Sequence, residues 1–297
     1  MVQFVLVGAL ILLVVAVVSL RSAYGRVDDD VVAEWAGRHE LAVDDANRPL
    51  VEWYLRTART LRTWGALAGL LLPPLVELAW SGQPRFLGMA SGGGAQPGDI
   101  VFIFLGYLAG ALYAEVSLVR PLDPSLPRSA SIVPRELEDY LPRRLLWAQR
   151  AAGAAVVVGT LLLPLMDFPP QVDRPTWPGI VAWAVVVAAF TLGLERLQRW
   201  LVRRPQPFTD PSLVAADDAI RSQSVHSLAG SGLAVLLLQV GFLLGTAAGT
   251  GGPVQAWVLG PLAVAALLLA LAACQWGSHR AWRVRRHLEF PPPAVSA

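Results

Sequence analysis

The chain has 297 residues, of which 55% are hydrophobic and 15% are charged, and its formal net charge is +2. A soluble domain of this length carries about 25% charged residues. The composition therefore excludes an ordinary soluble enzyme, a disordered chain and a disulfide-stabilised scaffold. All 24 basic residues are arginine, which excludes chemistry that needs a lysine, and the single cysteine, Cys274, excludes an intramolecular disulfide.

Seven segments approach the roughly 20 apolar residues that a helix needs to cross about 30 Å of hydrocarbon. They are residues 2–20, 64–80, 100–118, 151–166, 177–194, 228–245 and 254–274. The fourth is short and is expected to borrow the apolar residues Leu145, Leu146 and Trp147 that precede it. The pattern predicts an all-α fold, a polytopic integral membrane bundle of about seven transmembrane helices, with one N-terminal anchor followed by three hairpins.

The arginines predict the orientation, because loops rich in arginine stay on the cytoplasmic side. Of the 24 arginines, 22 lie in the first, third and fifth connections or in the tail, and only Arg85 and Arg174 lie on the other side. We therefore expect the N-terminus outside, the C-terminus inside, and a multi-pass protein of the cytoplasmic (plasma) membrane. Arg21 and Arg26 follow the first segment, whereas a secretory signal carries its charge in front, so an uncleaved anchor is expected.

This layout divides the chain into four regions. They are an anchor at 1–20, a cytoplasmic and interfacial helical segment at 21–63, a six-helix membrane bundle at 64–277 and a basic cytoplasmic tail at 278–297. Residues 48–63 put apolar side chains on one helix face and arginines largely on the other, which predicts a helix in the headgroup layer. A plain juxtamembrane connector is the alternative. The arginines of the tail favour contact with anionic inner-leaflet lipids.

The three hairpins begin about 80 residues apart, near Trp64, Trp147 and Leu228. The exits of the first two share a short string, in which Leu-Val-Arg is followed by Pro and then by Asp-Pro-Ser-Leu. A threefold pseudo-repeat would frame a transport path between the hairpins. A hairpin duplicated for stability is the alternative, and arginine and proline are also common at helix exits.

Pairs of glycines four residues apart predict close approach between helices, because they leave one helix face without side chains. Three such pairs occur, Gly65/Gly69, Gly106/Gly110 and Gly241/Gly245. They predict that the second, third and sixth spans form the packed centre of the bundle. Pro73 and Pro74 predict a kink in the second span, which either marks a gate or only shapes the bundle.

Two glutamates lie inside predicted spans, where an ionisable side chain costs about 2.5–3.5 kcal/mol on insertion scales and is a functional candidate. Glu77 lies near the outer end of the second span and Glu115 near the inner end of the third, so the two are expected to be far apart. Glu115 is expected to form an ion pair with Arg120 or with an arginine of residues 48–63. A transport or proton role is the alternative.

The densest polar stretch leads into the sixth span and contains Asp217, Asp218, Arg221, Ser222, Gln223, Ser224, His226 and Ser227. On a helix both aspartates reach Arg221, at the i+4 and i+3 spacings. Two interpretations remain open: a site for a lipid headgroup, a proton relay or a protein partner, and a salt-bridged interfacial turn without such a role. The candidate functional residues are Glu115, Arg120, Asp217, Asp218, Arg221 and His226.

No catalytic, cofactor or metal site is predicted. The four histidines form no pair with metal-ligand spacing, and no cysteine or carboxylate completes a ligand set. No Ser-His-Asp arrangement is evident, and no basic domain with interleaved aromatic residues supports nucleic-acid binding. The expected partners are the lipid bilayer, its anionic inner-leaflet lipids and a cytoplasmic or membrane protein.

Residues 202–207, Val-Arg-Arg-Pro-Gln-Pro, and residues 214–228, which include the polar stretch, resemble uncharacterised multi-span membrane proteins of GC-rich Gram-positive (actinobacterial) bacteria. The likeness covers about the last third of the chain and, more loosely, the whole layout. The exclusive use of arginine fits a GC-rich genome, because arginine codons are GC-rich. The resemblance implies a bacterial membrane protein and no particular activity.

These observations favour a non-catalytic membrane component of a transport system or other membrane complex, because the cytoplasmic face is large and rich in arginine. A stand-alone secondary transporter or channel for a small solute or ion is the alternative, favoured by the pseudo-repeat, the paired prolines and Glu115. A membrane-embedded lipid-modifying enzyme has the least support, because it would depend on scattered acids and arginines.

Overall fold

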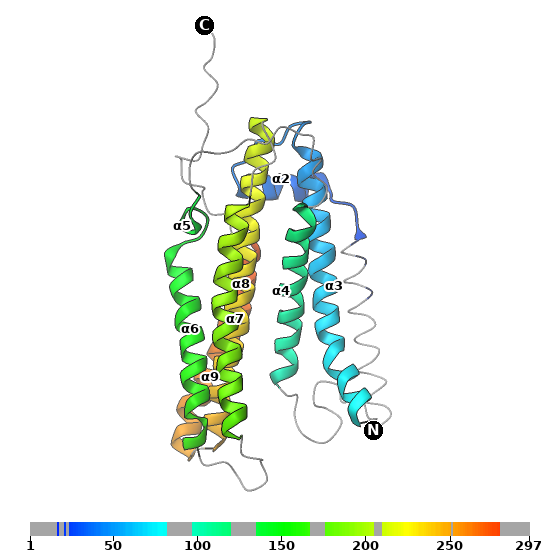
Figure 1. The fold of residues 1–297 in the computed structure, drawn as a ribbon. Helices are drawn as coiled ribbons and strands as arrows, with labels where there is room; N and C mark the ends of the chain where they lie inside the picture. The colour runs from blue at the N-terminus through cyan, green and yellow to red at the C-terminus, as the bar shows by residue number, and fades with distance from the viewer. Residues whose placement is uncertain are drawn as a thin grey trace.

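The structure is a computed structural model that describes Val17, Arg21 and residues 24–81, 97–119, 135–166, 176–204, 210–250 and 252–279. All regular elements in these ranges are helices (Figure 1). In chain order they are α2 (Asp29–Arg38), α3 (Arg48–Ser81), α4 (Pro97–Val119), α5 (Leu137–Tyr140), α6 (Arg143–Leu162) with a 3₁₀ turn (Leu163–Leu165), α7 (Trp177–Arg203), α8 (Pro211–Thr250) and α9 (Pro253–His279). The predicted anchor, apart from Val17, and the tail beyond residue 279 lie outside the described residues.

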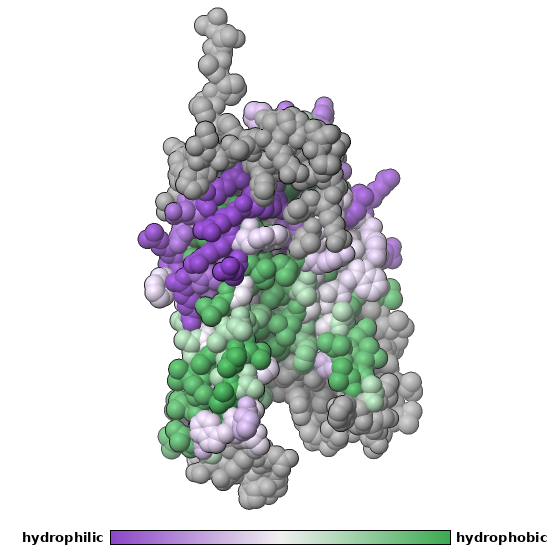
Figure 2. Space-filling model, in the orientation of Figure 1, coloured by the Kyte–Doolittle hydropathy of each residue, from purple (hydrophilic) through white to green (hydrophobic). Residues whose placement is uncertain are grey.

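Within the described residues, four helices are long and apolar enough to cross a membrane. They are Arg143–Leu165, Trp177–Arg203, Pro211–Thr250 and Val254–Gly277, and a shorter apolar helix covers Val101–Glu115. Large apolar side chains face outward, such as Val185 on α7 and Leu268 on α9. Figure 2 shows apolar residues gathered over the lower part of the helices and polar residues above them. An apolar girdle around helices of this length is typical of a membrane protein.

The predicted spans lie inside longer helices. The short fourth span does take in the residues that precede it, because α6 begins at Arg143 and includes Leu145, Leu146 and Trp147. The sixth predicted span is the middle and lower part of α8, which begins at Pro211. The polar stretch ahead of that span is therefore helical too, and it continues the same helix.

Helix α3 differs from the sequence interpretation. The amphipathic pattern of residues 48–63 predicts a separate helix in the headgroup layer, but α3 runs without a break from Arg48 to Ser81. Its apolar face meets protein instead of lipid, since Val51, Tyr54 and Ala58 are buried in one core with residues of α2 and α8. Any helix with one buried face shows this pattern, so the sequence does not distinguish the two environments. Pro73 and Pro74 lie inside α3, and the kink stays a prediction.

Helix α8 is the central helix of the described structure. Every residue from Ala216 to Leu236 is buried, because α3, α4, α6, α7 and α9 all pack against it. Asp210 caps the N-terminus of the helix, since its Oδ1 accepts hydrogen bonds from the backbone N–H groups of Ser212 and Leu213. Figure 1 shows α3 and α4 to the right of this helix, α6 to its left and α7 overlapping it in this view.

Glycines bring the backbones of α3 and α4 into direct contact. A Cβ added to Gly65 would overlap the carbonyl oxygen of Gly106, and one added to Gly106 would overlap the carbonyl oxygen of Gly65. Gly69 and Gly110 meet backbone carbonyls of the facing helix in the same way. The glycine pairs of the second and third predicted spans therefore face each other and lock α3 and α4 into one hairpin.

The tightest approach of α8 to α9 occurs at two other glycines. A Cβ on Gly230 would lie 2.7 Å from Cα of Gly277, and one on Gly277 would lie equally close to Cα of Gly230. Neither helix can carry a side chain at this point without moving its neighbour. The sequence does not reveal this pair, because its members lie on different helices.

The third predicted glycine pair packs at one of its two members. Gly241 is buried, and a Cβ added there would lie 3.2 Å from the carbonyl oxygen of Ala263 on α9. Gly245 is exposed, and the nearest atom to an added Cβ, Cβ of Ala263, lies 4.0 Å away. The prediction that Gly245 packs closely against another helix is therefore wrong. The spacing of two glycines identifies a shared helix face, but it does not fix how near the neighbouring helix lies along that face, and α9 lies farther away at Gly245 than at Gly241.

Replacing Gly65 or Gly106 by alanine is expected to lower the free energy of unfolding by about 1–3 kcal/mol, because the new methyl group meets a backbone carbonyl that cannot step aside. Denaturant unfolding of the purified chain in detergent measures the loss. Gly193→Ala on α7 is the matched control, since nothing lies within 4 Å of an added Cβ there. Equal stabilities of Gly65→Ala and Gly193→Ala would contradict the backbone contact.

Candidate functional site: a buried charge network

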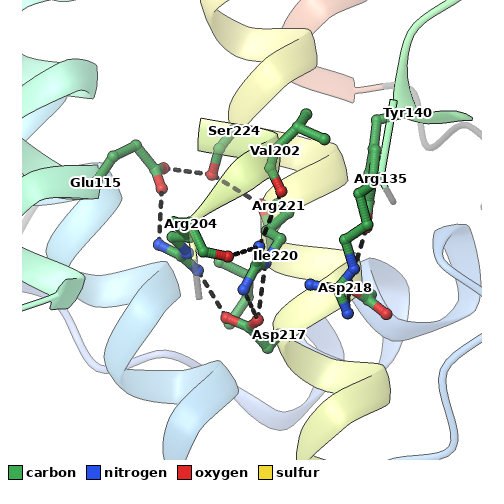
Figure 3. Close-up of polar contacts among 10 residues, drawn as sticks. All are labelled: Glu115, Arg135, Tyr140, Val202, Arg204, Asp217, Asp218, Ile220, Arg221 and Ser224. Atoms are coloured by element: carbon green, nitrogen blue, oxygen red, sulfur yellow. Dashed lines mark hydrogen bonds and ion pairs between the residues drawn. The ribbon is translucent and has the colours of Figure 1, made fainter. Parts of the chain in front are cut away.

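A set of charged and polar side chains is buried at the polar end of the helices (Figure 3). We call it the charge network, and it comprises Glu115, Arg135, Tyr140, Arg204, Asp217, Asp218, Arg221 and Ser224. Arg221 and Glu115 are each only 1% exposed. A buried charge is costly unless it is paired. The partners of each group therefore decide what the site can do.

Arg221 holds the end of α7 against α8. Its Nε and Nη2 lie 2.8 and 2.7 Å from Oδ2 of Asp217. Its Nη1 donates to the backbone carbonyls of Val202 and Arg204, at 3.1 and 2.6 Å. Carbonyls at a helix C-terminus lack partners within the helix and carry the negative end of its dipole. Arg221 supplies both a hydrogen-bond donor and a positive charge to these carbonyls, while Asp217 balances its charge.

Asp217 also binds a second arginine. Nη2 of Arg204 donates to Oδ1 of Asp217 at 2.6 Å. Nη1 of the same arginine lies 3.9 Å from Oε2 of Glu115, which is too long for a hydrogen bond. Because Arg204 directly follows α7, this one side chain links the end of α7 to α8 and approaches α4.

The two carboxyl oxygens of Glu115 differ in their contacts. Its Oε1 is hydrogen-bonded to the hydroxyl of Ser224 on α8. Its Oε2 has no hydrogen-bond partner within the described part of the chain. Of the two predicted partners, Arg120 lies outside the described residues, and Arg62 of α3 lies near enough to influence the charge of Glu115. The arginine within 4 Å is Arg204, which the sequence pattern does not indicate.

Asp218 reaches back to the segment before α6. Nη2 of Arg135 lies 3.3 Å from Oδ1 of Asp218, and the hydroxyl of Tyr140 donates to the same oxygen at 3.1 Å. Burial and the adjacent negative charge of Asp218 raise the pKa of Tyr140 above its usual range, so the phenol remains a donor. The expected ion pair with Arg221 is therefore formed by Asp217, and Asp218 instead attaches α5 to α8.

His226 lies apart from the charge network. Its Nδ1 donates to the carbonyl of Ser222 at 2.8 Å, one turn earlier on α8. Its ring centroid lies 5.8 Å from that of Trp276 on α9. One turn apart on α8, Nε2 of Gln223 donates to the hydroxyl of Ser227 at 3.2 Å. His226 thus packs between α8 and α9 and does not join the acids and arginines.

Two buried glutamines that the sequence does not single out form a second polar contact deeper in the bundle. Nε2 of Gln149 on α6 donates to the carbonyl of Ala229 on α8 at 3.3 Å, and Nε2 of Gln198 on α7 donates to Oε1 of Gln149 at 3.3 Å. Three helices are therefore joined by side chains that carry no charge.

A cap of residues 24–63 lies over the polar end of α8. Its core contains Val32, Trp35, Ala36, Val51, Tyr54 and Ala58, packed against Ala216, Ala219 and Ile220 of α8. His39 directly follows α2, and its Nε2 lies 3.3 Å from Oε1 of Gln223 on α8. Burial lowers the pKa of His39 to about 4, so the ring is neutral at neutral pH. The cap is thus attached to the central helix by an apolar core and by a neutral histidine.

The sequence pattern finds more than half of the charge network. It indicates Glu115, Asp217, Asp218, Arg221 and Ser224, because these lie in the polar stretch of one helix or inside a span. It misses Arg135 and Arg204, which lie in connections, where no periodicity points to a partner. The only available signal for Arg204 is its position immediately after α7. The side chains of Glu77 and His279 lie outside what the structure describes.

Within the described ranges, no group of three His, Cys, Asp or Glu side chains could hold a metal ion. The chain matches no family model, no curated protein and no solved structure. The contacts of the charge network join α4, α5, the end of α7 and α8 at one level, so the network fixes the arrangement of these helices.

Arg221→Met is expected to lower the free energy of unfolding by about 3 kcal/mol, because a buried aspartate loses one arginine and two buried carbonyls lose their donor. Arg221→Lys should lose less, because it keeps the charge but not the planar fork. Unfolding in detergent measures both variants. The control is Arg56→Met on the exposed side of α3, where about 0.5 kcal/mol or less is expected. A loss in Arg221→Met no larger than in this control would contradict the assignment.

Acidification is expected to weaken the attachment of the cap. The folded protein holds His39 neutral down to about pH 4, whereas the unfolded chain takes up the proton near pH 6.5. Stability conferred by the neutral ring is thus complete above pH 6.5 and is lost progressively as the pH falls toward 4, by on the order of 2 kcal/mol. Hydrogen exchange of the α2 amides at both ends of this window measures the change. His39→Gln removes the titrating group, and an unchanged pH dependence in this variant would show that another group is responsible.

Proposed function

We propose that the chain is a seven-span protein of a bacterial plasma membrane, with its N-terminus outside and its C-terminus inside. We propose further that it serves as a non-catalytic membrane component of a transport system or similar complex, and that its cap docks a cytoplasmic protein. The observation that carries the proposal is the cap itself, an ordered helical structure held over the polar end of the central helix.

The distribution of charge supports the orientation. Polar residues gather at the end of the molecule that carries the cap, and apolar residues cover the rest of the helices (Figure 2). This is the end at which the arginine-rich connections lie in sequence, and such connections stay in the cytoplasm. The four helices of membrane-spanning length, together with the apolar segments at 2–20, 64–80 and 100–118, make up the seven proposed spans.

Within the cap, α2 and the residues before it are held to α3 at several points. Arg59 donates to the carbonyl of Gly25 at 2.6 Å, and the indole N–H of Trp64 donates to the hydroxyl of Tyr24 at 2.8 Å. Arg48 forms an ion pair with Asp29 at the start of α2. A surface that is already ordered loses less conformational entropy when a partner binds. These contacts therefore favour a docking role over a loose connector.

The outer face of α2 supplies the docking surface. Val31 is 40% exposed, and the exposed acids Asp30 and Glu34 flank it. An apolar residue among acidic ones suits a partner whose own apolar contact is ringed by basic residues. Asp218 and Arg221 are buried, so a partner does not touch them. Substituting them would affect docking only through the position of the cap.

A photo-crosslinking amino acid at Val31 is expected to capture a cytoplasmic protein in native membranes, and affinity purification should recover that protein in a fixed ratio to the chain. The control places the same amino acid at Val185, which is 61% exposed in the apolar part of α7 and should capture lipid. Mass spectrometry identifies both adducts.

Recovery of the chain alone, with lipid adducts at both positions, would contradict the docking role. It would favour the stand-alone transporter or channel, for which Glu115→Gln should abolish flux. Product formation by the purified chain without partners would favour the lipid-modifying enzyme.

A further inference from the structure

If Glu115 is ionised, the hydroxyl of Ser224 faces two hydrogen-bond acceptors with only one hydrogen. The hydroxyl oxygen of Ser224 lies 2.7 Å from the carbonyl oxygen of Ile220 and also within hydrogen-bond distance of Oε1 of Glu115. A serine hydroxyl carries one hydrogen, whereas a carbonyl and a carboxylate carry none. With Glu115 ionised, Ser224 therefore satisfies one of these acceptors, and the other contact sets two oxygens against each other without a proton.

A proton on Glu115 resolves the conflict. The protonated carboxyl then donates from Oε1 to the hydroxyl of Ser224, and Ser224 donates to the carbonyl of Ile220. Both contacts become hydrogen bonds in one chain that runs from α4 to the backbone of α8. No other group has to move.

The second oxygen of Glu115 is consistent with a neutral carboxyl. Oε2 is buried without a hydrogen-bond partner among the described residues. Nη1 of Arg204 lies 3.9 Å from Oε2, whereas Nη2 of the same arginine lies 2.6 Å from Oδ1 of Asp217. Asp217 also binds Arg221. An ionised buried carboxylate attracts donors in this way. The negative charge therefore resides on Asp217, and Glu115 is the carboxyl that the arginines leave aside.

We infer that Glu115 is a buried proton-binding site, whose carboxyl donates to Ser224 and exchanges its proton with the aqueous phase at the polar end of the molecule. The inference goes beyond the proposed docking function and does not depend on it.

Loss of the proton has defined consequences. The proton leaves as H⁺, and Glu115 becomes a carboxylate that can accept the Ser224 hydrogen. Among the described residues, the charged and titratable groups that face it are Arg62 and Tyr54 on α3, Arg204 after α7 and Asp217 on α8. Nε and Nη2 of Arg62 and the hydroxyl of Tyr54 are buried near one another and near Ser224, without a well-aligned hydrogen bond to a described residue. They are the donors available to the ionised state.

Ionisation also acts on the charge network. Arg204 lies between the two carboxyl groups and contacts Asp217 closely only while Glu115 is neutral. An ionised Glu115 competes for Arg204, and Asp217 keeps Arg221. The protonation state of one side chain on α4 thereby sets how firmly the end of α7 is held.

Infrared spectroscopy of the full chain in lipid nanodiscs tests the site directly, through the carbonyl stretch of a protonated carboxyl group. We expect this band at neutral pH in the wild type and its loss in Glu115→Gln. Asp217→Asn, a matched change in a neighbouring carboxyl group, should retain it. Ser224→Ala should retain the band but shift its frequency, because the acceptor of the carboxyl hydrogen is gone. Raising the pH should remove the band with release of roughly one proton per chain.

Two results would overturn the inference. One is a Glu115→Gln spectrum that has lost an ionised carboxylate band at neutral pH and no protonated band. The other is a band whose frequency is the same in Ser224→Ala and in the wild type, a comparison that holds even if Glu115→Gln does not fold. Neither result depends on the capture of a protein at Val31, so the site and the docking role are tested separately.

Discussion

The pairing of Arg221 with Asp217 is the interaction on which the arrangement of the polar end depends. Both side chains project from the stretch of α8 in which every residue is buried, so neither can turn toward water. Either charge without the other would be a buried, unpaired ion, which is among the most costly defects in a folded chain. The donors that Arg221 has left over go to the terminal carbonyls of α7. The position of α7 is therefore tied to an ion pair on its neighbour.

A central helix of this kind places demands on the helices around it. Its lower part is apolar and is covered by apolar side chains of α4 and α9, such as Val101 and Ala270. Its upper part carries polar side chains that water cannot reach, so each neighbour has to supply polar partners there. α4 supplies Glu115, α5 supplies Tyr140, and His39, directly after α2, meets Gln223. The cap covers the remaining apolar face with Trp35.

The sequence predicts the parts of this structure that depend on local spacing. The Asp217–Arg221 pair, the facing glycines of α3 and α4 and the all-helical architecture with apolar, span-length helices all follow from residues three or four positions apart or from long apolar runs. The partners of Asp218 and Glu115 do not, because they come from parts of the chain that are distant in sequence. The pattern of residues 48–63 is read correctly as amphipathic but assigned to lipid instead of to α2 and α8. Burial against protein and burial against lipid leave the same stripe of apolar residues.

Local spacing also has a limit where two helices separate. The same four-residue interval that marks a backbone contact at Gly65 and Gly69 ends at an exposed residue in the pair Gly241 and Gly245. The interval describes one helix alone, whereas the contact depends on the crossing of two. On α8 the closest crossing is at Gly230, which faces a glycine of α9.

The two kinds of helix contact differ in stiffness, and this gives the position of Glu115 its significance. α3 and α4 touch through backbone atoms at facing glycines, and so do α8 and α9 at Gly230 and Gly277. Backbone contacts of this kind have no side chain that can change rotamer, so they resist rearrangement. Between the pairs, α4 meets α8 through side chains, which can repack. Glu115 lies at the polar end of this seam, hydrogen-bonded across it to Ser224. A change of charge at Glu115 therefore acts at the contact between the two pairs, where side chains can repack.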